Sequence, residues 1–238
     1  MKAIKFLLVI FLVLILSAPV LVAGEAVDIT PKMRSKAQVE LKKRDIDYKS
    51  IGRYFYEIEE NHLNEVELIL QAGFINANTK DNWGDAGLHV TARDESLIAM
   101  MELLLKYGAD LESSNDKKNT PLHETVIYKN HTGIKILIAR NVNLEARNIY
   151  GRTPITYAGF KNDITAVNEL YKAGADPTAK VVNGKLAILN DMTTRDLVIY
   201  WSKKRKFKHI DYKPMIARLE ELEVLWEAKQ KNAVVSVN

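Results

Sequence analysis

Short apolar runs recur at a fixed interval through the middle of the chain, and each ends at a residue that tolerates a left-handed backbone. These residues are Gly73, Gly108, Asn141 and Gly174, at intervals of 35, 33 and 33 positions. Glycine adopts positive φ without steric cost and asparagine at low cost, which is why both residues end helices. The pattern therefore predicts four amphipathic helices that end in phase. The apolar runs occupy residues 66–70, 101–105, 136–138 and 167–170.

A second marker keeps the same period. It falls at Gly84, Lys118, Gly151 and Gly184, at intervals of 34, 33 and 33 positions. Each of these residues is followed four positions later by a branched apolar residue, namely Leu88, Leu122, Ile155 and Ile188. Because two independent markers stay in register, the sequence predicts an array of similar two-helix units.

The segments between the markers carry a distinctive set of residues. They are Asp81-Asn82-Trp83-Gly84-Asp85-Ala86-Gly87-Leu88-His89, Asn119-Thr120-Pro121-Leu122-His123, Gly151-Arg152-Thr153-Pro154-Ile155-Thr156, Gly108-Ala109-Asp110 and Gly174-Ala175-Asp176. Over about residues 50–200 the chain resembles ankyrin repeats, because Thr-Pro-Leu-His and Gly-Ala-Asp fall at the right offsets in a unit of about 33 residues. The resemblance implies an all-α solenoid of about four to five stacked helix–turn–helix units with hairpin loops, counting degenerate end repeats.

Helix starts follow from the same segments. Thr120 and Thr153 are expected to be N-cap acceptors, each followed by a proline at the first helical position, where a missing N–H costs nothing. The second repeat has Ala86-Gly87 instead, and Asp85 could supply the cap if its helix begins one residue early. The last repeat, residues 181–191, also lacks the capping pair, as end repeats often do.

One unit cannot bury its apolar residues alone, so stacked neighbours are expected to share a core. The residues expected to point into this core are Leu88, Leu104, Leu122, Leu137, Ile155 and Leu170, with Phe55 and Ile58 in a first capping repeat.

Both flanks of the array are expected to cover its ends. Residues 25–49 form a basic segment in which Thr30-Pro31 opens a helix over 32–43. Residues 201–238 combine a basic linker with a C-terminal capping helix that begins at Pro214. Its apolar stripe consists of Ile216, Leu219, Leu222 and Trp226.

The N-terminus has the features of a signal peptide. Lys2 and Lys5 precede an uninterrupted apolar run over residues 6–16, and Val22-Ala23-Gly24 offers small or branched residues for cleavage. Residues 1–24 are therefore predicted to direct the protein to the periplasm or to secretion. The alternative is an uncleaved membrane anchor, because the uncharged stretch approaches the roughly 20 residues of a spanning helix.

Composition excludes several classes of function. The chain has no cysteine, so disulfides, thiolate metal sites and cysteine nucleophiles are excluded. A net charge of +4, from 34 basic and 30 acidic residues, is small for a nucleic-acid binder. His123-Glu124 is not followed by a second histidine at Ile127, so the zinc-protease spacing fails. We expect no catalytic site, metal or cofactor. The resemblance implies that the His89 and His123 rings link adjacent loops by hydrogen bonds.

A basic run follows the array. It consists of Lys203, Lys204, Arg205, Lys206 and Lys208. Such runs are usually solvated linkers. The alternative is weak contact with an anionic membrane surface.

The resemblance places protein binding on hairpin tips and on the exposed side of the first helices, which together form a concave surface. The tip positions are Asn82, Trp83, Asp85, Asp116, Lys117, Asn119, Ile149, Tyr150 and Arg152. The helix positions are Arg93, Asp94, Ile127, Tyr128, Phe160 and Lys161. Aromatic residues beside arginine and lysine are typical of interface hot spots.

The leading hypothesis is a monomeric, non-enzymatic adaptor or inhibitor-like binder that acts on another protein outside the cytoplasm. One alternative is a membrane-associated envelope scaffold, held by the basic run or by an uncleaved anchor. Another is an unrecognised hydrolase, which would need a buried carboxylate or histidine pair in the cleft.

Overall fold

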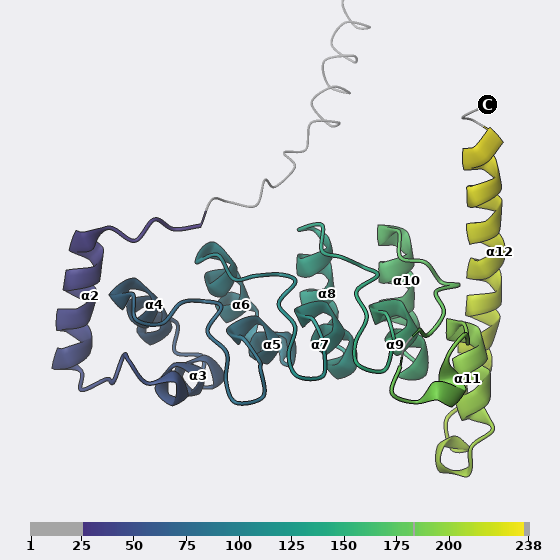
Figure 1. The fold of residues 1–238 in the computed structure, drawn as a ribbon, viewed down its shortest axis with the longest axis horizontal. Helices are drawn as coiled ribbons and strands as arrows, with labels where there is room; N and C mark the ends of the chain where they lie inside the picture. The colour runs from purple at the N-terminus through teal and green to yellow at the C-terminus, as the bar shows by residue number, and fades with distance from the viewer. Residues whose placement is uncertain (1–25, 183, 236–238) are drawn as a thin grey trace, which may run out of the picture.

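The computed structural model describes residues 26–182 and 184–235, whose regular elements are helices apart from one isolated β-bridge. Figure 1 shows the helices in file along the molecule, in an inner and an outer row. The inner row is α3 (Ile51–Glu59), α5 (Gly87–Ala92), α7 (Pro121–Tyr128), α9 (Pro154–Phe160) and α11 (Thr194–Ser202). The outer row is α4 (Leu63–Ala72), α6 (Ile98–Lys106), α8 (His131–Ile138) and α10 (Ile164–Ala173). The remaining elements are α2 (Pro31–Lys43), α12 (Lys213–Val235) and the 3₁₀ helices η1 (Glu95–Leu97), η2 (Ala187–Leu189) and η3 (Arg205–Phe207).

Each inner helix packs on the inner helices before and after it. Helix α5 contacts α3 and α7, and α9 contacts α7 and α11, while each outer helix packs on the inner helix of its own unit. This arrangement confirms the predicted all-α solenoid of stacked helix–turn–helix units. The predicted signal peptide, residues 1–24, lies outside the described residues and stays a prediction.

The periodic glycine and asparagine positions have the expected backbone. At the ends of the outer helices φ is 77° at Gly73, 76° at Gly108, 57° at Asn141 and 106° at Gly174. In the hairpins φ is positive at Gly84, Lys118 and Gly151. The repeat spacing is therefore set by residues that reverse the chain at two points in each unit.

The helix caps agree with the sequence only in part. Thr153 Oγ1 accepts from the Thr156 N–H at 3.4 Å, as expected. Thr120 is the N-cap of α7, and its hydroxyl lies 3.0 Å from His123 Nδ1. The suggestion that Asp85 caps α5 is wrong, because the N-cap is Ala86. No side chain caps α5 at Ala86, and the His89 ring accepts the N–H of Ala86 itself at 3.0 Å, as the His123 ring does for Thr120 in α7.

The shared core forms as predicted. The side chains that become buried between the stacked units are Phe55, Ile58, Leu88, Leu104, Leu122, Leu137, Ile155 and Leu170. The periodicity shifts by one residue in the last repeat, where Ile188 is 69% exposed and Leu189 is buried. In this unit the 3₁₀ turn η2 precedes the inner helix α11, so the residue four positions after the hairpin marker lies in a 3₁₀ turn and the buried apolar side chain comes one position later.

Both ends of the array are covered. At one end α2 packs on α4 through Ala37 and Leu41, and Gln38 Nε2 donates to the Ala72 carbonyl at 3.0 Å. At the other end α12 packs on α10 and α11 and buries Leu219 and Leu222 (Figure 1). Ile216 and Trp226 are half-buried beside them. The two flanking helices thus cap the solenoid.

Two buried histidines link consecutive hairpins. Nδ1 of His89 and of His123 accepts the backbone N–H of the N-cap residue, so the ring proton lies on Nε2. Nε2 then donates at 3.0 Å to the carbonyl of the next hairpin, Asn119 for His89 and Arg152 for His123. Burial lowers the pKa of both rings, that of His123 to about 4, although the carbonyl acceptors oppose the shift. These histidines are structural, as the resemblance implied.

A glycine pair tests the role of hairpin contacts. An alanine Cβ at Gly151 would overlap the Val182 carbonyl, whereas at Gly174 it would meet nothing within 4 Å, and both residues have positive φ. We expect Gly174→Ala to lower the free energy of unfolding by about 1–2 kcal/mol through backbone strain alone. Gly151→Ala adds the overlap and should lower it by roughly 2–5 kcal/mol. Urea unfolding followed by circular dichroism measures both, and equal losses would contradict this account.

The histidine links make stability depend on pH. His123 has a folded pKa of about 4, below the value of 6.5 of an unfolded chain, so its contribution is complete above pH 6.5 and is lost as pH falls toward 4. Between pH 7 and 4.5 the unfolding free energy should lose about 2–3 kcal/mol from this group. Urea unfolding at the two pH values should show that His123→Gln removes this part of the pH dependence. His209→Gln, at an exposed position, is the control and should leave it in place.

Candidate functional site

The hairpins that connect the units are hydrogen-bonded to one another in a row. The Asp116 N–H donates to the Trp83 carbonyl at 3.1 Å, and the Ile149 N–H donates to the Lys117 carbonyl at 2.8 Å. The Lys185 N–H donates to the Ile149 carbonyl at 3.1 Å and extends the row into the last repeat. The hairpin tips are therefore fixed relative to one another by main-chain contacts.

Each of the first three hairpins is also closed from within by one side chain. Asp81 Oδ1 accepts the N–H groups of Trp83 and Asp85 at 2.8 and 2.9 Å. Asn115 Oδ1 and Asn148 Oδ1 accept the N–H groups two and four residues later in the same way. We did not predict this role from sequence. Its signal is an Asp or Asn recurring at 81, 115 and 148 with the period of the array.

The predicted binding residues fall into three groups by exposure. Asn82, Trp83, Asp94, Asp116, Lys117, Tyr128 and Tyr150 are exposed; Arg93, Ile127, Ile149, Phe160 and Lys161 are half-buried; Asp85, Asn119 and Arg152 are buried. Three large aromatic side chains face solvent, with exposed fractions of 71% for Trp83, 54% for Tyr128 and 37% for Tyr150. We call the surface formed by Trp83, Arg93, Lys117, Tyr128 and Tyr150 the inner surface.

The expectation of an exposed side chain is wrong for Asp85, Asn119 and Arg152. Polar partners from the adjacent unit draw Asp85 and Asn119 inward, whereas aromatic rings enclose Arg152. Phe160 is half-buried because its ring packs edge-on against Trp201 at 5.6 Å and Phe207 at 6.0 Å. The exposed aromatic residues of the inner surface are thus three, one fewer than expected from sequence.

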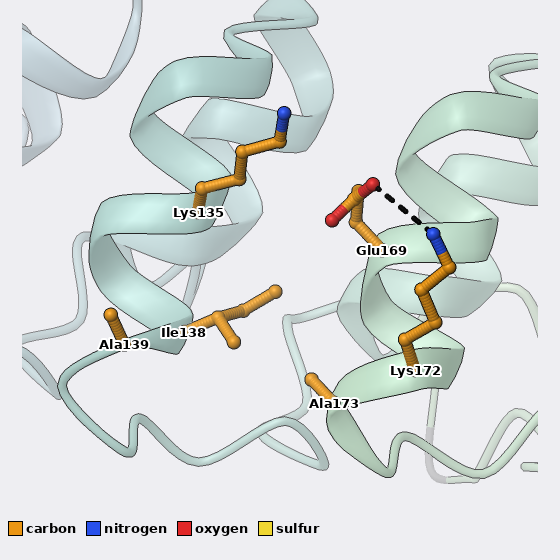
Figure 2. Close-up of a pocket in the computed structure, with 6 residues that line it drawn as sticks. All are labelled: Lys135, Ile138, Ala139, Glu169, Lys172 and Ala173. Carbon is orange, nitrogen blue, oxygen red and sulfur yellow. Dashed lines mark ion pairs between the residues drawn. The ribbon is translucent and has the colours of Figure 1, made fainter. Parts of the chain in front are cut away.

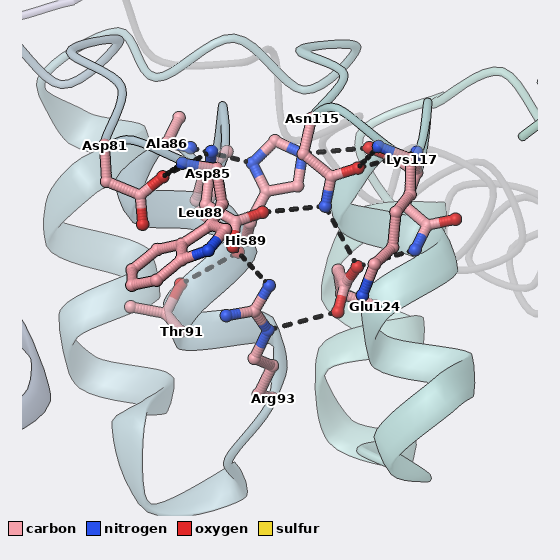
Figure 3. A network of polar contacts seen from close by, with 12 residues as sticks. Asp81, Asp85, Ala86, Leu88, His89, Thr91, Arg93, Asn115, Lys117 and Glu124 are labelled. Carbon is pink, nitrogen blue, oxygen red and sulfur yellow. Dashed lines mark hydrogen bonds and ion pairs between the residues drawn. The ribbon is translucent and has the colours of Figure 1, made fainter. Parts of the chain in front are cut away.

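Arg93 of the inner surface joins two buried carboxylates of neighbouring units (Figure 3). Arg93 Nη2 donates to Asp85 Oδ2 at 2.5 Å, and Nε donates to Glu124 Oε2 at 3.1 Å. Asn115 Nδ2 donates to the remaining oxygen of each carboxylate, to Asp85 Oδ1 at 2.7 Å and to Glu124 Oε1 at 3.2 Å. Asn119 Nδ2 also donates to Glu124 Oε1, at 2.8 Å.

This network has a structural role. All four carboxylate oxygens accept a hydrogen bond, and the two negative charges share one guanidinium. Burial lowers the pKa of Arg93, but hydrogen bonding to Asp85 and the charge of Glu124 outweigh it and raise that pKa overall. Asp85 and Glu124 are therefore a pair of buried carboxylates such as a hydrolase would need. Each of their oxygens, however, accepts a hydrogen bond within the network that joins two units.

A cavity of about 320 Å³ lies between the outer helices α8 and α10 (Figure 2). It is lined by Lys135, Ile138, Ala139, Glu169, Lys172 and Ala173. Its one ion pair joins Glu169 and Lys172 within α10 at 3.7 Å. These residues lie on the outer row and belong to a different face from the inner surface.

Comparison with known proteins supports the resemblance seen in the sequence. A family model of ankyrin repeats matches residues 88–181 in three copies. The chain is 30% identical over 120 residues to the tyrosine-protein kinase Shark of Drosophila melanogaster, which is 49% of this chain and 12% of the kinase. It is 39% identical over 73 residues to the palmitoyltransferase ZDHHC17 of Danio rerio, 30% of this chain and 12% of that protein.

A viral relative has the repeat in its name. The putative ankyrin repeat protein FPV024 of fowlpox virus is 26% identical over 107 residues, 44% of this chain and 18% of that protein. The chain thus matches less than a fifth of the length of each of these three relatives, and the similarity concerns repeats rather than catalytic domains. Residues 88–181 therefore match ankyrin repeats in sequence and form stacked helix pairs in the structure.

Proposed function

We propose that this protein is a non-enzymatic adaptor or inhibitor-like protein that binds another protein through the inner surface. The observation that carries the proposal is the row of fixed hairpins that present Trp83 and Tyr150 to solvent, with exposed Tyr128 at the end of α7. Large aromatic side chains are costly to leave in water and supply much of the energy of protein interfaces. Arg93 lies under Tyr128, with Cζ 5.8 Å from the ring centroid, which adds a cation at the same place.

We further propose that the protein acts outside the cytoplasm, in the periplasm or after secretion. The support is the sequence of residues 1–24, with two lysines before an apolar run and small residues at its end. The N-terminal mass of the protein recovered from cell fractions tests this part. A chain that begins near Glu25 in a soluble extracellular or periplasmic fraction is the expected result.

The inner surface can be tested by removing two of its aromatic side chains. We expect Trp83→Ala combined with Tyr150→Ala to reduce capture of the partner at least ten-fold, since hot-spot aromatics contribute about 2 kcal/mol or more each. The measurement is affinity capture from the native compartment with quantitative mass spectrometry, and circular dichroism verifies the fold.

Val224→Ala with Leu225→Ala is the matched control. These residues are 68% and 47% exposed on α12, so the pair removes comparable apolar surface away from the inner surface. Capture should survive in this control. If the aromatic double variant keeps every captured protein, the inner surface is not the binding site.

A membrane-associated scaffold is the second candidate. Lys203, Lys204, Lys206 and Lys208 are all exposed, as contact with an anionic surface requires. Within residues 26–182 and 184–235 the helices are too short or too polar to cross a bilayer. Sedimentation with vesicles containing 30% phosphatidylserine at low salt, together with an intact Met1 in the membrane pellet, would favour this candidate over the adaptor.

A further inference from the structure

Arg152 is a buried cation that has no acidic partner among the described residues. Its side chain is 95% enclosed, since only 5% of the residue is exposed, and its Nε has no hydrogen-bond acceptor. The guanidinium carbon lies 4.6 Å from the centroid of the Phe160 ring and 5.6 Å from those of Tyr150 and Tyr157. Ring faces attract a cation, but they cannot accept the directional hydrogen bonds of its five N–H groups.

A carboxylate of the preceding unit shows what is missing. Glu124 in α7 binds, together with Asp85, the half-buried Arg93 at the end of α5. The 33-residue period places Tyr157 at the position of Glu124. The unit that contains Arg152 therefore has a phenol where its neighbour has a carboxylate, and among the described residues no ion pair involves Arg152, whose Nε has no acceptor. Burial lowers the pKa of Arg152, which reflects this lack of a compensating anion.

A second unsatisfied donor lies close by. The indole Nε1 of Trp201 is buried and has no acceptor among the described residues. Its ring centroid is 5.6 Å from that of Phe160, the ring that also contacts Arg152. Buried polar groups in folded proteins nearly always have a hydrogen-bond partner. Two donors without a partner, Arg152 Nε and Trp201 Nε1, belong to side chains that contact the same Phe160 ring, and this indicates an acceptor that comes from outside the chain.

We propose that Arg152 and the rings around it form the binding site for a carboxylate side chain in an acidic segment of the partner protein. This inference rests on the proposed function and names the chemistry of the partner. A planar carboxylate matches the two parallel N–H groups of a guanidinium. Tyr150 is the most exposed of the three rings, so the carboxylate would approach Arg152 from the side of Tyr150.

The surrounding charge favours the same ligand. Exposed Lys203, Lys204 and Lys206 follow Trp201 directly in the chain, and Phe207 of the same run packs on Phe160. Lys185, also exposed, lies in the hairpin bonded to that of Tyr150. A segment with several carboxylates can therefore place one on Arg152 and others beside these lysines. A flat membrane fits less well, because Arg152 is recessed behind aromatic rings.

An octaglutamate peptide is the probe, with octaglutamine as the neutral reference. Isothermal titration of the purified protein at low salt should detect octaglutamate and not octaglutamine. Arg152→Gln should weaken binding at least ten-fold, because the variant loses the charged hydrogen bonds of the guanidinium. Lys118→Gln, which removes an exposed hairpin charge, is the control and should change binding at most about three-fold.

A second measurement does not depend on a variant that folds. The Arg152 Nε–H resonance of the unmodified protein should shift on titration with octaglutamate and stay in place with octaglutamine. An unmoved resonance at saturation, or wild-type affinity in a folded Arg152→Gln variant, overturns the inference. Binding to vesicles with 30% phosphatidylserine but not to octaglutamate also overturns it and favours a membrane ligand.

The two proposals can fail separately. If Arg152→Gln still captures the partner while the Trp83→Ala and Tyr150→Ala double variant does not, the carboxylate site is wrong and the proposed function stands. If both variants retain capture, the inner surface itself is wrong.

Discussion

The structure depends on the inability of any one two-helix unit to bury its own apolar face. Leu88, Leu122 and Ile155 are fully enclosed only because the next unit covers them. The same dependence requires a cover at each end, which α2 and α12 provide (Figure 1). Stability is thus built from contacts between neighbours, and the side of the hairpins and inner helices that no neighbour covers is left for other molecules.

Polar contacts also connect each unit to its neighbour. Each histidine link and each hairpin bond joins residues about one repeat apart in the chain, such as His89 with Asn119. The Asp85–Arg93–Glu124 network extends this linkage beneath the inner surface. In the unit after Glu124, Arg152 is surrounded by aromatic rings and makes no ion pair with a described residue. The strongest structural evidence for a ligand therefore lies at the point where the internal pattern of pairing stops.

Sequence reasoning was most successful where a single residue determines local backbone. Gly73, Gly108, Asn141 and Gly174 could be identified because few residues accept positive φ, and their spacing fixes the repeat. It failed for Asp85 and Arg152, whose position in a hairpin suggests exposure. Whether such a side chain turns inward depends on its partners in the fold, which are Asn115 of the next unit for Asp85 and the Phe160 ring of the same unit for Arg152. A one-residue shift, as between Ile188 and Leu189, likewise depends on a 3₁₀ turn that no periodic pattern specifies.

The main-chain bonds between hairpin tips have a consequence for the entropy of association. Loops that form a contact surface usually lose conformational freedom when a ligand arrives, and this loss opposes binding. Here the carbonyls of Trp83, Lys117 and Ile149 already hold the following hairpins. The hairpins therefore lose their conformational freedom during folding. A ligand that contacts one hairpin tip meets the other tips already at the separation they have in the complex.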